Sequence, residues 1–118
     1  MQIVAPPSRI ARDNHERRRY LRYAVRCRCW LESESATVFG PTADVALGGV
    51  FLRTAVPLSE GAQVQVALTL GQDAEPVRAR GVVTRAVRAR HGLRHGLGVE
   101  FVDILDGRDD LRRFLRGR

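Results

Sequence analysis

The sequence predicts a mainly β protein, a small antiparallel β-barrel of five to seven strands with a short C-terminal helix. Three observations predict this fold. Apolar and polar residues alternate with a period of two over most of the chain, as in strands with one buried face. Clusters of glycine, proline and small polar residues separate the alternating segments. Only the C-terminal tail has the apolar spacing of an amphipathic helix.

The alternation and the turn signals place the strands in order along the chain. We expect strands over residues 23–31, 36–45, 50–54, 64–70, 76–89 and 97–102. The Gly40-Pro41 pair is a turn signal that interrupts the second strand. Gly81 predicts a bulge or bend in the fifth. The basic segment 88–92 is expected to form the turn before the last strand.

The tail has the features of a short helix. Asp106 can cap its N-terminus, because a carboxylate accepts hydrogen bonds from the first free backbone N–H groups. Leu111, Phe114 and Leu115 then follow at helical spacing. We expect these three side chains to cover one end of the barrel.

The length of the chain predicts one domain. At 118 residues it can bury a stable core, and we expect a flexible arm over residues 1–15 ahead of the barrel domain at residues 16–118. No apolar run approaches the roughly 20 residues needed to span a bilayer, and no secretory signal is evident. These observations predict a cytoplasmic protein without membrane insertion.

The charge and the cysteines restrict the chemistry. The net charge is +7, and all 20 Lys and Arg residues are arginine. The rigid, planar guanidinium group of arginine can bind phosphate or guanine through two hydrogen bonds. Cys27 and Cys29 point to the same face of a strand and are expected to be buried as small hydrophobic residues. Two cysteines are too few for a structural zinc site, and the three histidines lack metal-ligand spacing. We therefore expect no metal and no cofactor.

Two clusters carry the functional information. The first is the arginine-rich segment 16–22, just ahead of the first strand. The second is an acidic residue followed by a glycine pair, at Asp44 and Gly48-Gly49. Together they offer three things to an anionic purine nucleotide. These are guanidinium groups for phosphate and base edge, a carboxylate for base N–H groups, and glycine backbone that a ligand can approach closely. They predict a ligand site and not a catalytic centre, since no nucleophile–base pair, paired carboxylates or phosphate-binding loop is evident.

These residues resemble the PilZ domain family of bacterial cyclic di-GMP receptors. Arg18 and Arg22 fit the family's RxxxR motif, and Asp44 and Gly49 fit its [D/N]xSxxG motif. The closing segment 98–102 is also similar to the last barrel strand of the family, so the resemblance covers residues 16–118. One position departs from the pattern, because Ala46 stands where the family has serine. Losing that hydroxyl should weaken binding about three- to tenfold.

The resemblance implies a role for each motif residue. Arg18 and Arg22 would bind the guanine O6/N7 edge and the phosphates, and Asp44 would accept hydrogen bonds from guanine N1–H and N2–H₂. Gly49 would allow close approach of the backbone. Arg17 lies just before RxxxR, and in this position the chain is similar to family members that bind a stacked dimer of cyclic di-GMP. Binding would fold the arginine-rich segment over the barrel and present an altered surface to an unknown protein partner.

Two other functions remain open from the sequence. A degenerate domain of the same fold could act as a protein-interaction adaptor without binding nucleotide, and Ala46 is the main support for this alternative. A basic barrel could also bind nucleic acid non-specifically. An aromatic content of only 6% makes nucleic acid an unlikely partner, since it leaves little stacking surface.

Overall fold

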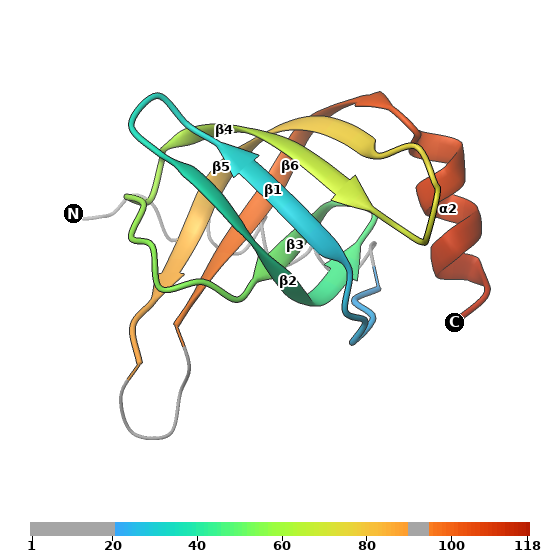
Figure 1. Cartoon of the computed structure of the whole chain (residues 1–118), viewed down its shortest axis with the longest axis horizontal. Coiled ribbons are helices and arrows are strands. Elements are labelled where there is room, and N and C mark those ends of the chain that lie inside the picture. Colours follow the sequence, from blue (N-terminus) through green and yellow to red (C-terminus); the bar gives the residue numbers. More distant parts are fainter. Residues whose placement is uncertain (1–20, 90–94) are drawn as a thin grey trace, which may run out of the picture.

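Six strands pair antiparallel into a closed barrel in the computed structural model, which describes residues 21–89 and 95–118 (Figure 1). The strands are β1 (Arg28–Glu32), β2 (Thr37–Ala46), β3 (Gly49–Leu52), β4 (Gln63–Thr69), β5 (Val77–Val87) and β6 (Gly96–Asp106), followed by helix α2 (Arg108–Arg116). Their order round the barrel is β1-β2-β3-β6-β5-β4. The predicted fold class is confirmed. The predicted arm at residues 1–15, and part of the turn at 88–92, lie outside the described residues.

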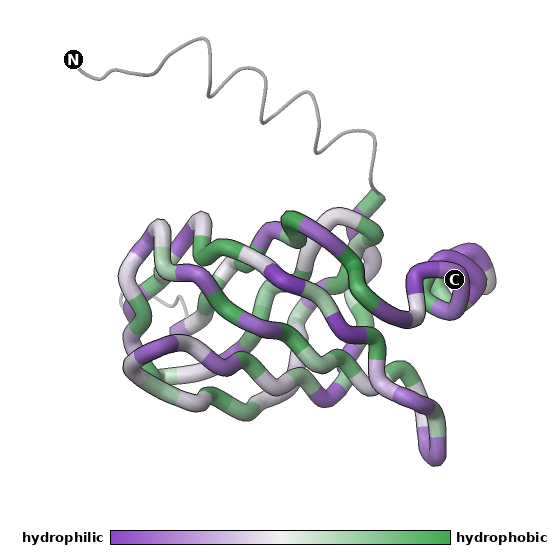
Figure 2. The backbone as a smooth tube through the Cα atoms, turned by 90° about the horizontal axis from the view of Figure 1, so that it is seen from above, coloured by the Kyte–Doolittle hydropathy of each residue, from purple (hydrophilic) through white to green (hydrophobic). Residues whose placement is uncertain are grey.

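The barrel interior is an aliphatic core built by the period-two alternation. In β1 and β4 every second side chain is buried, with Leu31 and Leu68 completely inaccessible. The alternation of hydrophobic and hydrophilic residues can be followed along the strands in Figure 2. Cys27 and Cys29 are both buried and unpaired, as predicted. Burial, with a smaller contribution from Cys27, raises the pKa of the Cys29 thiol to about 12.

The first regular strand is β1, at Arg28–Glu32, so the prediction of a strand over residues 23–31 was partly wrong. Tyr23 is joined to Val45 by a pair of backbone hydrogen bonds, both 2.9 Å long. Between Tyr23 and β1, the buried Thr42 hydroxyl accepts a hydrogen bond from the Cys27 N–H and donates one to the Val25 carbonyl, each 2.8 Å. The Thr42 N–H also donates a 2.8 Å backbone hydrogen bond to the Cys27 carbonyl. The chain therefore runs along β2 through a mixture of side-chain and backbone hydrogen bonds, without forming a regular strand.

The Gly40-Pro41 pair lies inside β2 and forms no turn, contrary to the prediction. The Pro41 carbonyl accepts a 2.8 Å hydrogen bond from the Arg53 N–H. A Cβ built on Gly40 would lie 2.5 Å from the Arg53 carbonyl oxygen. The glycine is therefore required by a close approach of two backbones. The bulge predicted at Gly81 is confirmed, since the β5–β6 register shifts between Arg80 and Gly81.

The last strand and the helix also differ from the prediction in their bounds. Strand β6 continues to Asp106, which lies on the strand and does not cap the helix. The N-cap is Gly107, in the left-handed region at φ 88° and without a side-chain hydrogen bond to the helix. Helix α2 lies at one end of the barrel (Figure 1), where Leu111 and Leu115 are buried in the core, as expected. No helix among the described residues is long and apolar enough to span a membrane.

Replacing Gly40 with alanine should destabilise the fold by about 1–3 kcal/mol, because the added methyl group meets backbone that cannot move freely. Gly71 is the matched control, since a Cβ there would meet no atom within 4 Å. Gly71→Ala should change the free energy of unfolding by less than about 0.5 kcal/mol. Urea unfolding followed by circular dichroism measures both values. Equal values for the two variants would contradict the close approach at Gly40.

Candidate ligand-binding site

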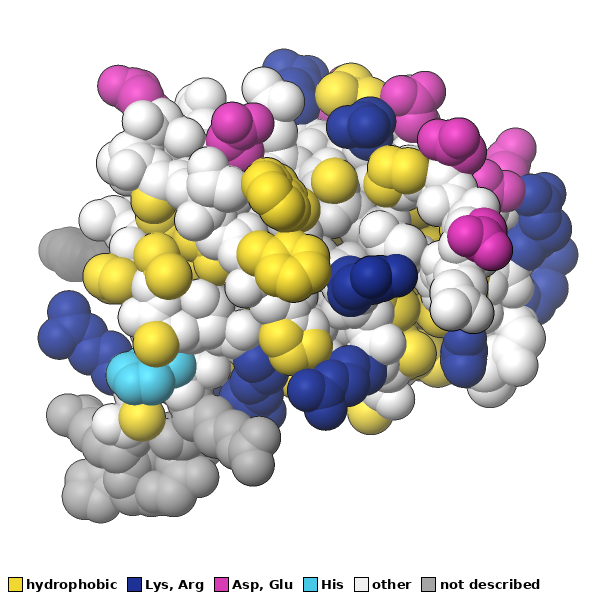
Figure 3. Space-filling view, in the orientation of Figure 1, with side chains coloured by type: hydrophobic (Ala, Val, Ile, Leu, Met, Phe, Trp, Pro, Cys, Tyr) yellow, Lys and Arg dark blue, Asp and Glu magenta, His cyan; other side chains and the backbone are white. Residues whose placement is uncertain are grey.

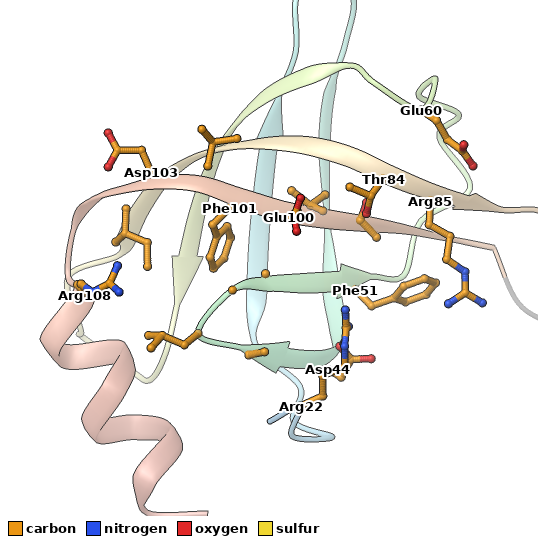
Figure 4. A pocket seen from close by; sticks show the side chains of 18 residues that line it. Arg22, Asp44, Phe51, Glu60, Thr84, Arg85, Glu100, Phe101, Asp103 and Arg108 are labelled. Carbon is orange, nitrogen blue, oxygen red and sulfur yellow. The ribbon is translucent and has the colours of Figure 1, made fainter. Parts of the chain in front are cut away.

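A groove of about 880 Å³ lies on the outer wall of the barrel, over β3 and β6. The β2–β3 hairpin forms one side, β5 and the loop at Glu60 lie along the other, and α2 closes one end (Figure 4). Arg22, Asp44, Phe51 and Arg85 lie toward one end of the groove in this view, and Asp103 and Arg108 lie toward the other. The groove brings together four of the six residues predicted from the motifs.

The ion pair between Arg22 and Asp44 is the most specific contact in the groove. Arg22 Nη1 donates a hydrogen bond to Asp44 Oδ1 at 2.9 Å, and the two side chains are 47% and 30% exposed. The paired hydrogen bonds between Tyr23 and Val45 hold the neighbouring residues in register. The backbone therefore positions this contact between residues far apart in sequence. Both groups remain accessible to a ligand from the groove.

Ala46 and Gly49 end β2 and begin β3, on either side of the Leu47-Gly48 turn. Ala46 lines the groove but is only 3% exposed. A Cβ built on Gly49 would lie 2.2 Å from the Val99 carbonyl oxygen on β6. The pairing of β3 with β6 therefore requires glycine at this position, whether or not a ligand approaches it.

A row of residues across four strands extends the site beyond the motifs. Asp44 is paired with Phe51, Phe51 with Gly98, and Gly98 with Arg85. A Cβ on Gly98 would lie 3.2 Å from the Arg85 Cβ, so the neighbouring side chains leave little room for a side chain at this position. The guanidinium carbon of Arg85 lies 5.7 Å from the centre of the Phe51 ring, and that of Arg53 lies 5.4 Å from it. An aromatic face and a second cation thus stand beside the Arg22–Asp44 pair.

Phe51 and Arg85 were missed as site residues by the sequence analysis. Phe51 was assigned to a short strand, and Arg85 belongs to a series of arginines on an exposed strand face. Their meeting depends on the registers of β3–β6 and β5–β6. The one signal in the sequence was the Gly96-Leu97-Gly98 spacing, since glycines in a strand often mark where another group approaches closely.

The charges in the groove are mixed. Asp44 is paired with Arg22, and Asp103 accepts a 3.2 Å hydrogen bond from Arg80. Arg85 and Arg108 form no ion pair within residues 21–89 and 95–118. Two cations with free donors are therefore available along the groove to an anionic ligand. Arg17 and Arg18, the other predicted site residues, lie outside the described part of the chain.

Comparison with known proteins agrees with the predicted fold and with the resemblance to the PilZ domain family. The model of the PilZ domain family matches residues 16–117. No curated protein sequence matches the chain. The solved structure of Bacillus subtilis inhibitor of motility (MotI/DgrA) has a similar fold, with a TM-score of 0.70 and 17% identity. The match covers 86% of this chain and 50% of that one, so this chain corresponds to about half the length of that protein.

A second similar structure is the PilZ domain of CeSA from a cellulose-synthesizing bacterium. It has a TM-score of 0.57 and 22% identity, over 82% of this chain and 96% of that one. At these identities both structures support the fold alone. The family model covers nearly the whole chain, and the chain belongs to the PilZ domain family.

Proposed function

We propose that this protein is a receptor for cyclic di-GMP that binds the dinucleotide in the groove over β3 and β6. The observation that carries the proposal is the Arg22–Asp44 pair on an accessible wall of that groove. PilZ domains generally bind this ligand and have no catalytic activity of their own, which supports the assignment. We propose that the protein acts in the cytoplasm.

Asp44 supplies selectivity for guanine. Its carboxylate accepts hydrogen bonds from guanine N1–H and N2–H₂, and adenine has no such pair of donors. The contact with Arg22 Nη1 uses one lone pair of Oδ1, so Oδ2 and the second lone pair of Oδ1 are left for the base. Arg22 orients the carboxylate and has other N–H donors for the phosphate or the guanine O6/N7 edge. The ion pair of the free protein therefore presents both groups toward the ligand.

Phe51, Gly98 and Arg85 form the continuation of this site. Because Gly98 carries no side chain, a flat base can approach the backbone of β6 beside the Phe51 ring. Arg85 then lies within reach of a phosphate or of the second guanine. The ligand carries two phosphodiester charges, and Arg85 adds a cation from β5 at the same end of the groove as Arg22.

The arginine-rich segment completes the site in this proposal. Arg18 supplies the second guanidinium of the motif, and Arg17 favours a stacked dimer of cyclic di-GMP because two ligands carry four charges. New charge-assisted contacts would order this segment over the groove and change the surface that the protein offers to a protein partner. A molar ratio near two ligands per chain in calorimetry supports the role of Arg17, and a ratio near one contradicts it.

The alternative is an adaptor of the same fold that does not bind nucleotide. The specific observation in its favour is Ala46, which removes a hydroxyl from the family motif. The two functions differ in the direct binding measurement described next.

Replacing Arg22 with alanine should weaken binding of cyclic di-GMP about 10- to 150-fold, because one charged hydrogen bond is lost. Arg112→Ala is the matched control. Arg112 is also a half-exposed arginine facing an aspartate, 45% exposed and 3.7 Å from Asp109, but it lies on α2 outside the groove. Calorimetric titration of the three proteins measures the effect. Equal affinities would contradict the site, and no binding by the unmodified protein favours the adaptor.

Replacing Arg85 with alanine should weaken binding about three- to tenfold, since this side chain contributes one cation at the edge of the site. Arg88→Ala is the control, because Arg88 is an exposed arginine just beyond β5 that does not line the groove. The same titration compares the two. A loss of affinity in Arg88→Ala equal to that in Arg85→Ala would show a general charge effect and not a local contact.

Ala46→Ser restores the family hydroxyl and should tighten binding about three- to tenfold. The side chain is 3% exposed, so a hydroxyl there has little access to water without ligand. The variant should therefore also be slightly less stable in its free form, by about 1 kcal/mol. Titration and thermal unfolding test the two effects. Weaker binding would mean that the hydroxyl cannot reach the ligand.

A further inference from the structure

Thr42 is the only buried polar residue in the described part of the chain, where it is 3% exposed. It lies on β2, two positions before Asp44, whose side chain lines the groove. Thr42 itself does not line the groove. A polar group is retained in a core where hydrogen bonds satisfy it. The partners of Thr42 therefore indicate what it holds in place.

These partners belong to the segment that precedes β1. The Thr42 N–H donates a hydrogen bond to the Cys27 carbonyl. The Thr42 hydroxyl accepts one from the Cys27 N–H and donates one to the Val25 carbonyl, and all three are 2.8 Å long. In a regular antiparallel pair the two residues would exchange two backbone hydrogen bonds. Here the hydroxyl takes the place of the Thr42 carbonyl, and it also satisfies Val25.

The segment bulges at this point. Four residues earlier in it, Tyr23 and Val45 are joined by paired backbone hydrogen bonds, each 2.9 Å long. Three residues, 24–26, separate the two attachments on the segment, whereas two residues, 43–44, separate them on β2. An extra residue of this kind takes backbone groups out of the ladder. The Thr42 hydroxyl satisfies such groups, so it stabilises the bulged course of the chain.

Strand β2 also changes its alternation here. Val38, Gly40 and Thr42 are buried, so a period of two would bury Asp44 as well. Instead, the register with β3 shifts between Thr42 and Asp44, and the next buried residue is Val45. The shift therefore turns the Asp44 side chain out of the core and into the groove.

Arg22 is placed by the same attachments. It immediately precedes Tyr23, and Val45, the partner of Tyr23, immediately follows Asp44. Arg22 Nη1 donates its 2.9 Å hydrogen bond to Asp44 Oδ1 beside this pair, and Figure 4 shows the two side chains together at one end of the groove. The guanidinium meets the carboxylate because the segment before β1 is held against β2.

We propose that Thr42 is a positioning residue for the ligand site. Its hydroxyl holds the segment before β1 against β2 and so sets Arg22 beside Asp44 before a ligand binds. This role rests on the proposed function, because the pair that Thr42 positions is the one assigned to cyclic di-GMP. A preorganised pair costs less to order on binding than two free side chains. Thr42 therefore contributes to affinity without contacting the ligand.

Thr42→Val removes the hydroxyl and keeps the shape of the side chain. The affinity for cyclic di-GMP should fall about tenfold, because Arg22 is no longer held beside Asp44. Thr42→Ser retains a hydroxyl and should bind within about threefold of the unmodified protein. Thr37→Val is the matched control, since Thr37 is exposed at the first position of β2, outside the groove. Calorimetric titration of the four proteins, each shown to be folded by circular dichroism, measures the effect. Equal affinities of Thr42→Val and Thr37→Val would overturn the proposal.

A double-mutant cycle shows whether Thr42 acts through Arg22. In protein that already carries Arg22→Ala, Thr42→Val should weaken binding less than about threefold, since the residue that Thr42 positions is gone. The same loss of affinity in both backgrounds would overturn the proposal, because Thr42 would then affect binding by another route.

Hydrogen exchange tests the attachment without ligand. The Tyr23 and Val45 N–H groups should exchange at least about tenfold faster in Thr42→Val than in Thr42→Ser, because the hydroxyl no longer holds the segment. Equal exchange rates would overturn the role of the hydroxyl even where cyclic di-GMP binds. Absence of binding by the unmodified protein would instead overturn the proposed function, and faster exchange in Thr42→Val would then show a purely structural role for Thr42.

Discussion

The pairing of β3 with β6 is the contact on which the rest of the structure depends. It closes the barrel between the hairpin made by β2 and β3 and the long β5–β6 pair. The two strands approach so closely that Gly49 has no room for a side chain, since a Cβ would lie 2.2 Å from the Val99 carbonyl oxygen. The same pairing aligns Asp44, Phe51, Gly98 and Arg85 in one row across the outer wall. The closure of the barrel and the shape of the groove therefore have one cause.

Much of the fold could be predicted because burial imposes a period of two on the strands. Strand β4 is the clearest case, where buried valines and a leucine alternate with exposed or partly buried residues. The errors occurred where backbone contacts override local signals. Gly40-Pro41 has the composition of a turn, but the glycine lies in a strand against the Arg53 carbonyl. Asp106 has the composition of a helix cap, but the chain reaches the helix through the left-handed Gly107.

The candidate site could be predicted only in part. Arg22 and Asp44 were assigned from the sequence to two different motifs of one site. The ion pair that joins them across 22 positions was not predicted. The places of Phe51 and Arg85 in the groove could not be predicted, because a shift of one residue in either register would turn these side chains to the other face. The exposed Trp30–Phe39 pair depends on register in the same way, since the pairing of β1 with β2 sets these two residues opposite each other. The closed barrel thus separates the candidate groove on one wall from exposed aromatic residues on the other (Figure 3).

The proposed function depends on selective recognition of guanine by the Asp44 carboxylate in the groove over β3 and β6. The most direct test is a calorimetric titration of the unmodified protein with cyclic di-GMP and, separately, with cyclic di-AMP, which has the same phosphates and other bases. Binding of cyclic di-GMP at about 1 µM or tighter is expected. Cyclic di-AMP should bind at least about 10- to 150-fold more weakly, because adenine lacks the donors that the carboxylate requires. Equal affinity for the two dinucleotides, or no binding of either, would contradict the claim.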